Sequence, residues 1–208
     1  MYDVLCFGDS NTWGYNALTA ARFAPEVRWT GVLQSSLGPE YRVIEEGLNG
    51  RTTVWEDPVE GDKVGKRHLL PCLLSQAPLD LVIIMLGTND LKMRYSAPVT
   101  DVAAGVSILA DIVLGSTTGK DGTAPSLLIV APPAFAKLSE FAAMFEGGVE
   151  KSRSLGGLYA EVARAHGCAF LDAGSVIRST DVDGIHLDAS AHAALGRALS
   201  REVKRILG

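Results

Sequence analysis

Three residues in this sequence could together perform nucleophilic catalysis. Ser10 follows the first apolar run of the chain, and His186 ends the turn-like sequence Asp183-Gly184-Ile185-His186. A carboxylate three residues before a histidine can accept a hydrogen bond from Nδ1–H, which leaves Nε2 free to take a proton from a serine hydroxyl. The spacing therefore predicts Ser10 as nucleophile, His186 as its base and Asp183 as the residue that orients the base. Asp181 is a rival carboxylate, but the i, i+3 spacing favours Asp183.

Acyl transfer through a serine also requires donors for the oxyanion that develops on the carbonyl oxygen. Three donors are available: the backbone N–H of Ser10, the backbone N–H of Gly50 and the side-chain NH₂ of Asn89. Gly50 belongs to the Asn49-Gly50 turn after the second predicted strand. We therefore expect an oxyanion hole formed by Ser10, Gly50 and Asn89.

Each of these residues has a competing structural role. Ser10 could cap a helix, because serines that follow strands often do. Asn89 could close a turn, since Asn-Asp pairs commonly do so. Asp9 and Asp90 could hold strand-end loops by accepting backbone N–H bonds. The presence of serine, asparagine, aspartate and histidine together favours catalysis.

Further residues could shape a substrate pocket. The candidates near the nucleophile and the oxyanion turn are Asp9, Asn11, Trp13 and Asn49. Trp13 could equally be a packing residue. Phe135, Phe141 and Phe145 could line a channel, bury a lid or form a subunit contact. We expect His192, six residues after His186, to lie on the surface.

Short apolar runs alternate with stretches of helical period along the chain. The predicted strands are Val4–Phe7, Tyr41–Glu45, Asp80–Leu86, Ser126–Ala131 and Cys168–Leu171, and the predicted helices are Arg28–Leu37, Val99–Leu114, Val149–Ala165 and Ala189–Leu207. Residues 55–66 and 115–125 are predicted loops. This alternation predicts an α/β three-layer sandwich with a central parallel five-stranded sheet, formed by one domain over residues 1–208. In such sheets ligands bind at the carboxyl ends of the strands, where the candidate residues lie.

Composition argues against several other classes of protein. The 208 residues are 47% hydrophobic and carry a net charge of −5, with no run of Lys or Arg of the kind that nucleic-acid binders use. No apolar run approaches the length of a membrane span, and the N-terminus lacks a basic signal-peptide region. Cys6, Cys72 and Cys168 are odd in number and form no CxxC pair, which favours free thiols over a disulfide or metal site. We expect a cytoplasmic protein without cofactor or metal.

Four sequence blocks resemble those of the GDSL/SGNH hydrolase family. They are GDSN near the N-terminus, a glycine after the second strand, GTND after the third and DGIH near the C-terminus. The four letters of the SGNH name correspond to Ser10, Gly50, Asn89 and His186. The family glycine could also be Gly47, but Asn49-Gly50-Arg51-Thr52 is more similar to the small-Gly-x-Thr pattern of that block. Asn11 departs from the family pattern, in which many members carry Leu or Ile. The resemblance implies the flavodoxin-like SGNH fold.

Within that family the chain looks most similar to the bacterial arylesterase and acyltransferase branch. The supporting stretches are CFGDSNTWGY, RFAPEVRWTGVL, LDLVIIMLGTND, VAPP, FEGG and DAGSVI. The resemblance implies short-chain acyl esters as substrates, no metal, and a homo-oligomer whose subunits narrow the mouth of the active site. It also implies that the acyl group can pass to alcohols as well as to water.

Two alternatives to an arylesterase remain open at the level of sequence. A carbohydrate acetylesterase, a thioesterase or a lysophospholipase would use the same catalytic groups. A non-catalytic binding module could hold a small ligand at the glycine-rich strand ends, because the fold alone does not define a function. A binding module has no need of an oriented base, which favours the esterase.

Overall fold

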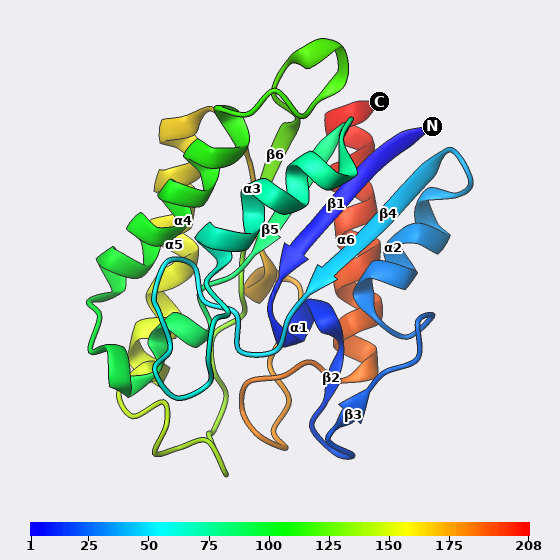
Figure 1. The fold of residues 1–208 in the computed structure, drawn as a ribbon. Helices are drawn as coiled ribbons and strands as arrows, with labels where there is room; N and C mark the ends of the chain where they lie inside the picture. Colours follow the sequence, from blue (N-terminus) through cyan, green and yellow to red (C-terminus); the bar gives the residue numbers. More distant parts are fainter.

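The computed structural model describes residues 1–208, which form a five-stranded parallel sheet with the order β4-β1-β5-β6-β7 (Figure 1). Its strands are β1 (Tyr2–Gly8), β4 (Tyr41–Gly47), β5 (Leu81–Met85), β6 (Ser126–Ala131) and β7 (Ala169–Asp172). The chain passes from β1 to the edge strand β4 and then returns to β5 on the other side of β1. This reversal makes the carboxyl ends of β1 and β5 the point where such sheets bind ligands.

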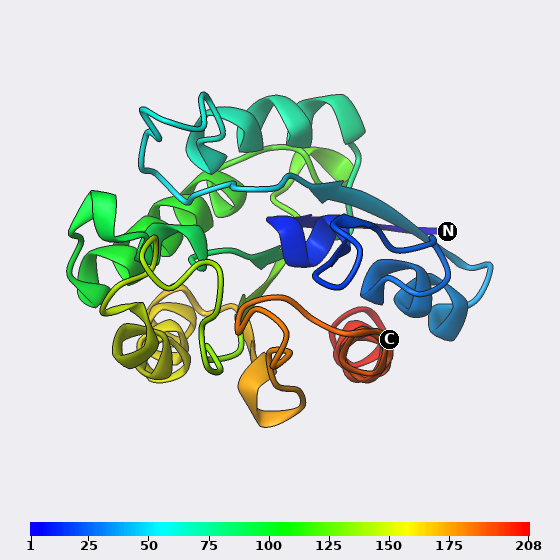
Figure 2. The same cartoon turned by 90° about the horizontal axis from the view of Figure 1, so that it is seen from below.

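Helices cover both faces of this sheet. Their bounds are α1 (Ser10–Trp13), α2 (Trp29–Leu37), α3 (Gly65–Gln76), α4 (Val99–Leu114), α5 (Gly148–His166) and α6 (Ala189–Leu207). Viewed from below, α2 and α6 lie on one side of the sheet, and α3, α4 and α5 lie on the other (Figure 2). A short antiparallel pair, β2 (Tyr15–Asn16) and β3 (Ala21–Arg22), follows α1.

The continuous apolar runs are explained by this layering, because alternate side chains of a strand point to opposite faces. Leu5 and Phe7 of β1 pack in the core under α3, α4 and α5. Val4 and Cys6 of the same strand pack in the core under α2 and α6. Both faces of each central strand are therefore buried, and the sheet forms a rigid base for the residues at its carboxyl edge.

The three-layer α/β fold predicted from the sequence is confirmed, and all five predicted strands and four predicted helices are present. Helix α3 was not predicted. Its sequence carries Pro71 in its interior, and Leu70 and Leu74 are 43% and 61% exposed, so the apolar pattern does not follow one helical face. Four short 3₁₀ turns were also absent from the prediction: η1 (Asn89–Leu91), η2 (Met93–Tyr95), η3 (Lys120–Gly122) and η4 (Ala173–Ser175).

The three cysteines are free thiols. Cys6 is buried in the sheet, and Cys72 and Cys168 are partly buried. None of the helices has both the length and the apolar character that a membrane crossing would require.

Candidate active site

The turn after β1 presents Ser10 at the carboxyl edge of the sheet. Asp9 caps α1 by accepting a hydrogen bond from the backbone N–H of Asn11 at 2.9 Å, so Ser10 is the first helical residue and not the cap. Gly8 allows the turn to be tight, because a Cβ there would lie 2.0 Å from Thr12 Oγ1. The Ser10 side chain is held in place by this cap and by the packed strand beneath it.

His186 and Asp183 complete a hydrogen-bonded chain with Ser10. His186 Nε2 lies 2.9 Å from Ser10 Oγ, and His186 Nδ1 lies 2.5 Å from Asp183 Oδ2. Asp183 Oδ1 accepts the backbone N–H groups of Ile185 and His186 at 2.9 and 3.0 Å. Because Asp183 can only accept from Nδ1–H, Nε2 is the nitrogen that accepts from the serine hydroxyl. This geometry can activate a serine nucleophile.

The Asp183 carboxylate is completely buried. Burial raises its pKa, but hydrogen bonds from the His186 ring and from the backbone of His186 and Ile185 outweigh burial, so the pKa lies below its ordinary value. Asp183 therefore stays ionised at neutral pH and can stabilise the imidazolium that forms when His186 takes a proton. The ring of Tyr15 lies against the imidazole, with 4.4 Å between ring centroids, and limits how it can tilt.

A cavity of about 170 Å³ brings Ser10 and His186 together with Gly50 and Asn89. The backbone N–H groups of Ser10 and Gly50 donate no hydrogen bond within the protein. Asn89 Nδ2 donates one hydrogen bond to Arg51 O at 3.1 Å, which orients the amide and leaves its second hydrogen free. Three free donors at one cavity are what an oxyanion requires.

Arg51 links the elements that carry these groups. Its buried guanidinium lies 4.1 Å from the centroid of the Phe7 ring, donates to Gly8 O at 2.8 Å, and also donates to Glu46 O. Its own carbonyl orients Asn89. Arg51 therefore connects the ends of β1 and β4 through its side chain, and it contacts the predicted oxyanion donor after β5 through its backbone carbonyl.

Asp90, in the turn after β5, holds the segment that follows Arg51 by hydrogen bonds with Thr53. Its carboxylate accepts the backbone N–H of Thr53 at 3.0 Å and the Thr53 hydroxyl. Burial raises the pKa of Asp90 to about 6, although the hydrogen bonds from Thr53 act in the opposite direction. Asp90 and Asp9 thus hold strand-end loops by accepting backbone N–H groups, as the structural interpretation of the sequence predicted.

The rest of the cavity wall mixes apolar and charged side chains. Besides the four residues above, it consists of Tyr15, Asn49, Glu60, Thr88, Lys92, Phe141, Met144, Phe145 and Ile185. Of the predicted pocket residues only Asn49 belongs to this wall. Phe141 and Phe145, for which the sequence leaves three roles open, belong to this wall. Tyr15, Glu60 and Lys92 also belong to it, but no local motif marks them.

Asp9, Asn11 and Trp13 do not line the cavity, which corrects their assignment as pocket residues. The Asp9 carboxylate turns inward to cap α1. The Asn11 amide joins the two halves of the site by donating to Ile185 O at 3.4 Å and accepting from Leu187 N–H at 3.1 Å. Trp13 packs under Arg22, whose guanidinium lies 5.0 Å from the centroid of the Trp13 ring.

The expected surface position of His192 is wrong, because the side chain is completely buried. Its Nδ1 accepts the backbone N–H of Trp29 at 3.2 Å, at the start of α2, where Arg28 provides no side-chain cap. His192 lies outside the catalytic cavity. The signal that could have placed it is its position on the buried stripe of α6, one residue after Ala191 and three before Leu195.

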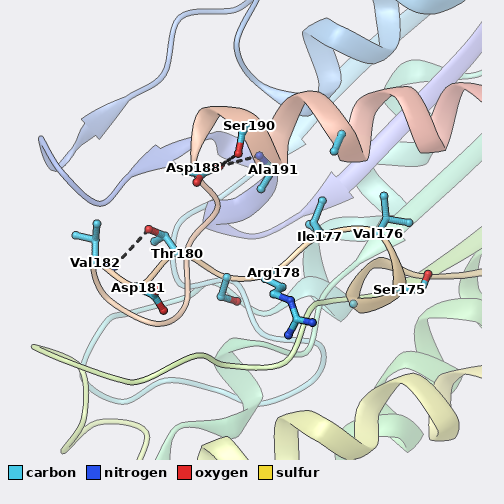
Figure 3. Close-up of a pocket in the computed structure, with 13 residues that line it drawn as sticks. Ser175, Val176, Ile177, Arg178, Thr180, Asp181, Val182, Asp188, Ser190 and Ala191 are labelled. Atoms are coloured by element: carbon cyan, nitrogen blue, oxygen red, sulfur yellow. Dashed lines mark hydrogen bonds between the residues drawn. The ribbon is translucent and has the colours of Figure 1, made fainter.

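A larger groove of about 780 Å³ lies between residues 174–182 and the first turns of α6 (Figure 3). It contains Arg178 and Asp181, but none of the residues of the catalytic cavity. Asp181, the rival of Asp183, thus faces a different hollow from the one that contains Ser10 and His186. Ser10, Gly50, Asn89 and His186 all lie at the smaller cavity.

Comparison with known proteins agrees with this architecture. The model of the GDSL-like lipase/acylhydrolase family matches residues 6–194. An aryl esterase from M. smegmatis is 44% identical with a TM-score of 0.96, and a carbohydrate acetylesterase from Sinorhizobium meliloti is 41% identical with a TM-score of 0.96. Both similarities cover 100% of this chain and 100% of the other. A search of curated proteins found no match.

A more distant structure, a lipase/acylhydrolase from Enterococcus faecalis, is 21% identical with a TM-score of 0.69, over 99% of this chain and 96% of that one. At this identity the similarity concerns the fold alone. The chain belongs to the GDSL-like lipase/acylhydrolase family. It is a serine esterase, a hydrolase of carboxylic esters.

Proposed function

We propose that this chain hydrolyses short-chain acyl esters through an acyl-enzyme on Ser10. The observation that carries the proposal is the hydrogen-bonded chain Ser10–His186–Asp183 at the edge of a cavity with three free donors. Ser10 Oγ attacks the carbonyl carbon while His186 Nε2 takes its proton, and the oxyanion is held by Ser10 N–H, Gly50 N–H and Asn89 Nδ2.

The proton then moves from His186 to the departing alcohol, and the C–O bond of the ester breaks to leave an acyl group on Ser10. Water attacks this acyl group and gives its proton to His186, and the carboxylic acid departs as the Ser10 hydroxyl forms again. Asp183 keeps the imidazole oriented in both halves of the cycle.

The size of the cavity supports a short acyl group. Its volume of about 170 Å³ is smaller than the roughly 300–1,000 Å³ of ordinary ligand pockets. Phe141, Met144 and Phe145 supply an apolar wall. An acetyl or propionyl group fits such a space, and a fatty acyl chain would have to extend beyond it.

Carbohydrate acetylesterase is the second candidate activity. It is favoured by the 41% identity to the Sinorhizobium meliloti enzyme and by the carboxylate of Glu60 in the cavity wall. Transfer of the acyl group to an alcohol is chemically possible whenever an alcohol replaces water in the second half of the cycle. A homo-oligomer and a cytoplasmic location stay predictions from the sequence.

Covalent labelling with a fluorophosphonate, followed by peptide mapping, tests the nucleophile. We expect one adduct, on Ser10, and loss of 4-nitrophenyl acetate turnover by about 10³-fold or more in Ser10→Ala. Ser35→Ala is the matched control, because Ser35 is exposed on α2 and should leave both labelling and turnover intact. Full turnover in Ser10→Ala would overturn the proposal and favour the binding-module alternative.

A further inference from the structure

Glu60, in the loop after the predicted oxyanion turn, is a charged residue of the cavity wall that takes no part in the acyl-transfer steps proposed above. Its carboxylate lies beside Gly50, since a Cβ at Gly50 would be 2.6 Å from Glu60 Oε2. The side chain is 26% exposed, and the residue lines the cavity that contains Ser10 and His186. A charged acceptor thus stands next to the reacting carbonyl and is accessible to a ligand.

The carboxylate is held in place by two lysines, of which Lys92 is buried and Lys63 is partly exposed. Lys92 Nζ donates to Glu60 Oε1 at 2.6 Å and to Asp57 Oδ2 at 3.3 Å, and the Lys92 side chain is only 2% exposed. Lys63 Nζ lies 3.5 Å from Glu60 Oε2. The two ammonium groups balance the negative charge of Glu60, so that it does not oppose an oxyanion bound near Gly50.

Asp57 fixes the loop that carries Glu60. Its carboxylate accepts the backbone N–H groups of Val59 and Glu60 at 2.9 and 3.0 Å, and it receives hydrogen bonds from Arg94 at 2.7 Å and Tyr95 at 2.8 Å. Burial raises the pKa of Asp57, but these hydrogen bonds together lower it below its ordinary value, so the group stays ionised. The position of Glu60 is therefore set before any ligand binds.

The hydrogen-bonding capacity of Glu60 defines what it can recognise. An ionised carboxylate only accepts, and Oε2 has a free lone pair because its single partner, Lys63, is at long range. The matching group on a ligand is a donor. In an ester substrate, the donors available are hydroxyl groups on the alcohol part, which aryl and simple alkyl esters lack.

We propose that Glu60 is a specificity-determining residue that accepts a hydrogen bond from a free hydroxyl of the alcohol part, so that the cavity selects esters of polyols, sugars included. The inference rests on the proposed esterase function and assigns the substrate class of that site. Lys92 is a positioning residue that holds the carboxylate. A site that is built to bond a hydroxyl discriminates strongly against an analogue without one.

Glycerol 1-acetate and propyl acetate test this selection, because they share an acyl group and a three-carbon skeleton and differ by two hydroxyls. For the wild-type protein we expect kcat/KM to be at least about tenfold higher for glycerol 1-acetate, the fold-change of a hydrogen bond to a charged acceptor. Glu60→Gln should reduce that ratio several-fold, since a neutral amide oxygen is a weaker acceptor.

The double variant Glu60→Met/Lys92→Met removes both members of the ion pair. Replacing Lys92 as well avoids leaving a buried lysine without its Glu60 partner. The ratio of the double variant should fall to near one. Glu56→Gln is the matched control, because Glu56 is in the same loop with a side chain 70% exposed and should keep the wild-type ratio. A wild-type ratio near one, or a double variant that keeps the preference, would overturn the assignment of Glu60.

These outcomes are separate from the fate of the esterase proposal. If Ser10→Ala abolishes turnover of both acetates while the ratio is near one, the nucleophile stands and the role of Glu60 fails. If Ser10→Ala turns over both acetates at the wild-type rate, the esterase proposal itself fails and the ratio no longer reports on this site.

Discussion

Arg51 is a single residue that connects several parts of the site without lining its cavity. Its guanidinium joins Gly8 O and Glu46 O, and its carbonyl orients Asn89. In Arg51→Lys one ammonium nitrogen replaces a planar group with five donors, so the strand ends are no longer held by the same geometry. We expect kcat to fall about tenfold to a hundredfold, the cost of misplacing catalytic groups by a fraction of an ångström to 1 Å.

Steady-state kinetics with 4-nitrophenyl acetate measure this effect, with circular dichroism to show that the variant is folded. The change should appear mainly in kcat, because Arg51 does not line the cavity. Arg67→Lys is the control, since Arg67 is 52% exposed and pairs with Glu56 on the surface. Wild-type kcat in Arg51→Lys would show that the guanidinium is not needed to hold the ends of β1 and β4 in their catalytic arrangement.

The sequence marks some of these residues by a local pattern and others not at all. The pairing of Asp183 with His186 was predictable because it lies within one turn of chain. Glu60 and Lys92 are 32 residues apart and meet only through the fold, so neither has a local pattern that marks it. The assignment of Trp13 to the pocket failed because nearness in sequence to Ser10 does not determine which way a side chain points.

Between elements, His192 joins the start of α2 to α6. Burial lowers the pKa of His192 from 6.5 to about 4, with Asp188 acting in the opposite direction and His186 and Arg28 adding to the lowering. The neutral ring accepts the Trp29 N–H, and a protonated ring could not. The contact between these two helices should therefore depend on pH.

The sign follows from proton linkage. Between about pH 6.5 and pH 4 the unfolded chain binds a proton at this histidine and the folded chain does not, so the free energy of unfolding falls as the pH falls through this window. A lowering from 6.5 to about 4 corresponds to about 3 kcal/mol of stability, present above pH 6.5 and lost towards pH 4.

Urea unfolding of wild type and His192→Gln at pH 7 and pH 5 checks this. Glutamine can offer an acceptor to Trp29 N–H and does not titrate. Between pH 7 and pH 5 the free energy of unfolding should therefore fall more for wild type than for His192→Gln. His68→Gln controls for loss of a histidine, because the His68 side chain is 44% exposed. An identical pH dependence in wild type and His192→Gln would exclude His192 as the cause.

Strands and long helices were predictable because both faces of the sheet and one stripe of each helix must be apolar. Helix α3 was not, because it buries only Gly65, Leu69 and Leu73 and contains Pro71. Tertiary packing, and not local propensity, stabilises this element. The buried position of His192 was missed because its residue type was given more weight than its place on the apolar stripe of α6, between Ala191 and Leu195.

For the molecule as a whole, the order of strands decides where catalysis takes place. Because β1 and β5 are neighbours, the turn with Ser10 and the turn with Asn89 meet at one edge of the sheet. His186 comes to the same edge from the segment before α6. An aryl esterase and a carbohydrate acetylesterase both match this chain along their whole length, so proteins with these two names share the layout. In this chain we propose that the loop residue Glu60 selects the alcohol part.

The hydrogen bond between Ser10 and His186 joins residues that are 176 positions apart. A chain that ends before residue 183 would therefore contain Ser10, Gly50 and Asn89 without the proposed base, and we expect it to be inactive. The exposed loop at residues 120–123 divides the two sets of groups. We expect the separate fragments 1–121 and 122–208 each to show no hydrolysis of 4-nitrophenyl acetate. Activity should appear only when the two fragments are mixed and associate, so that turnover measures their association.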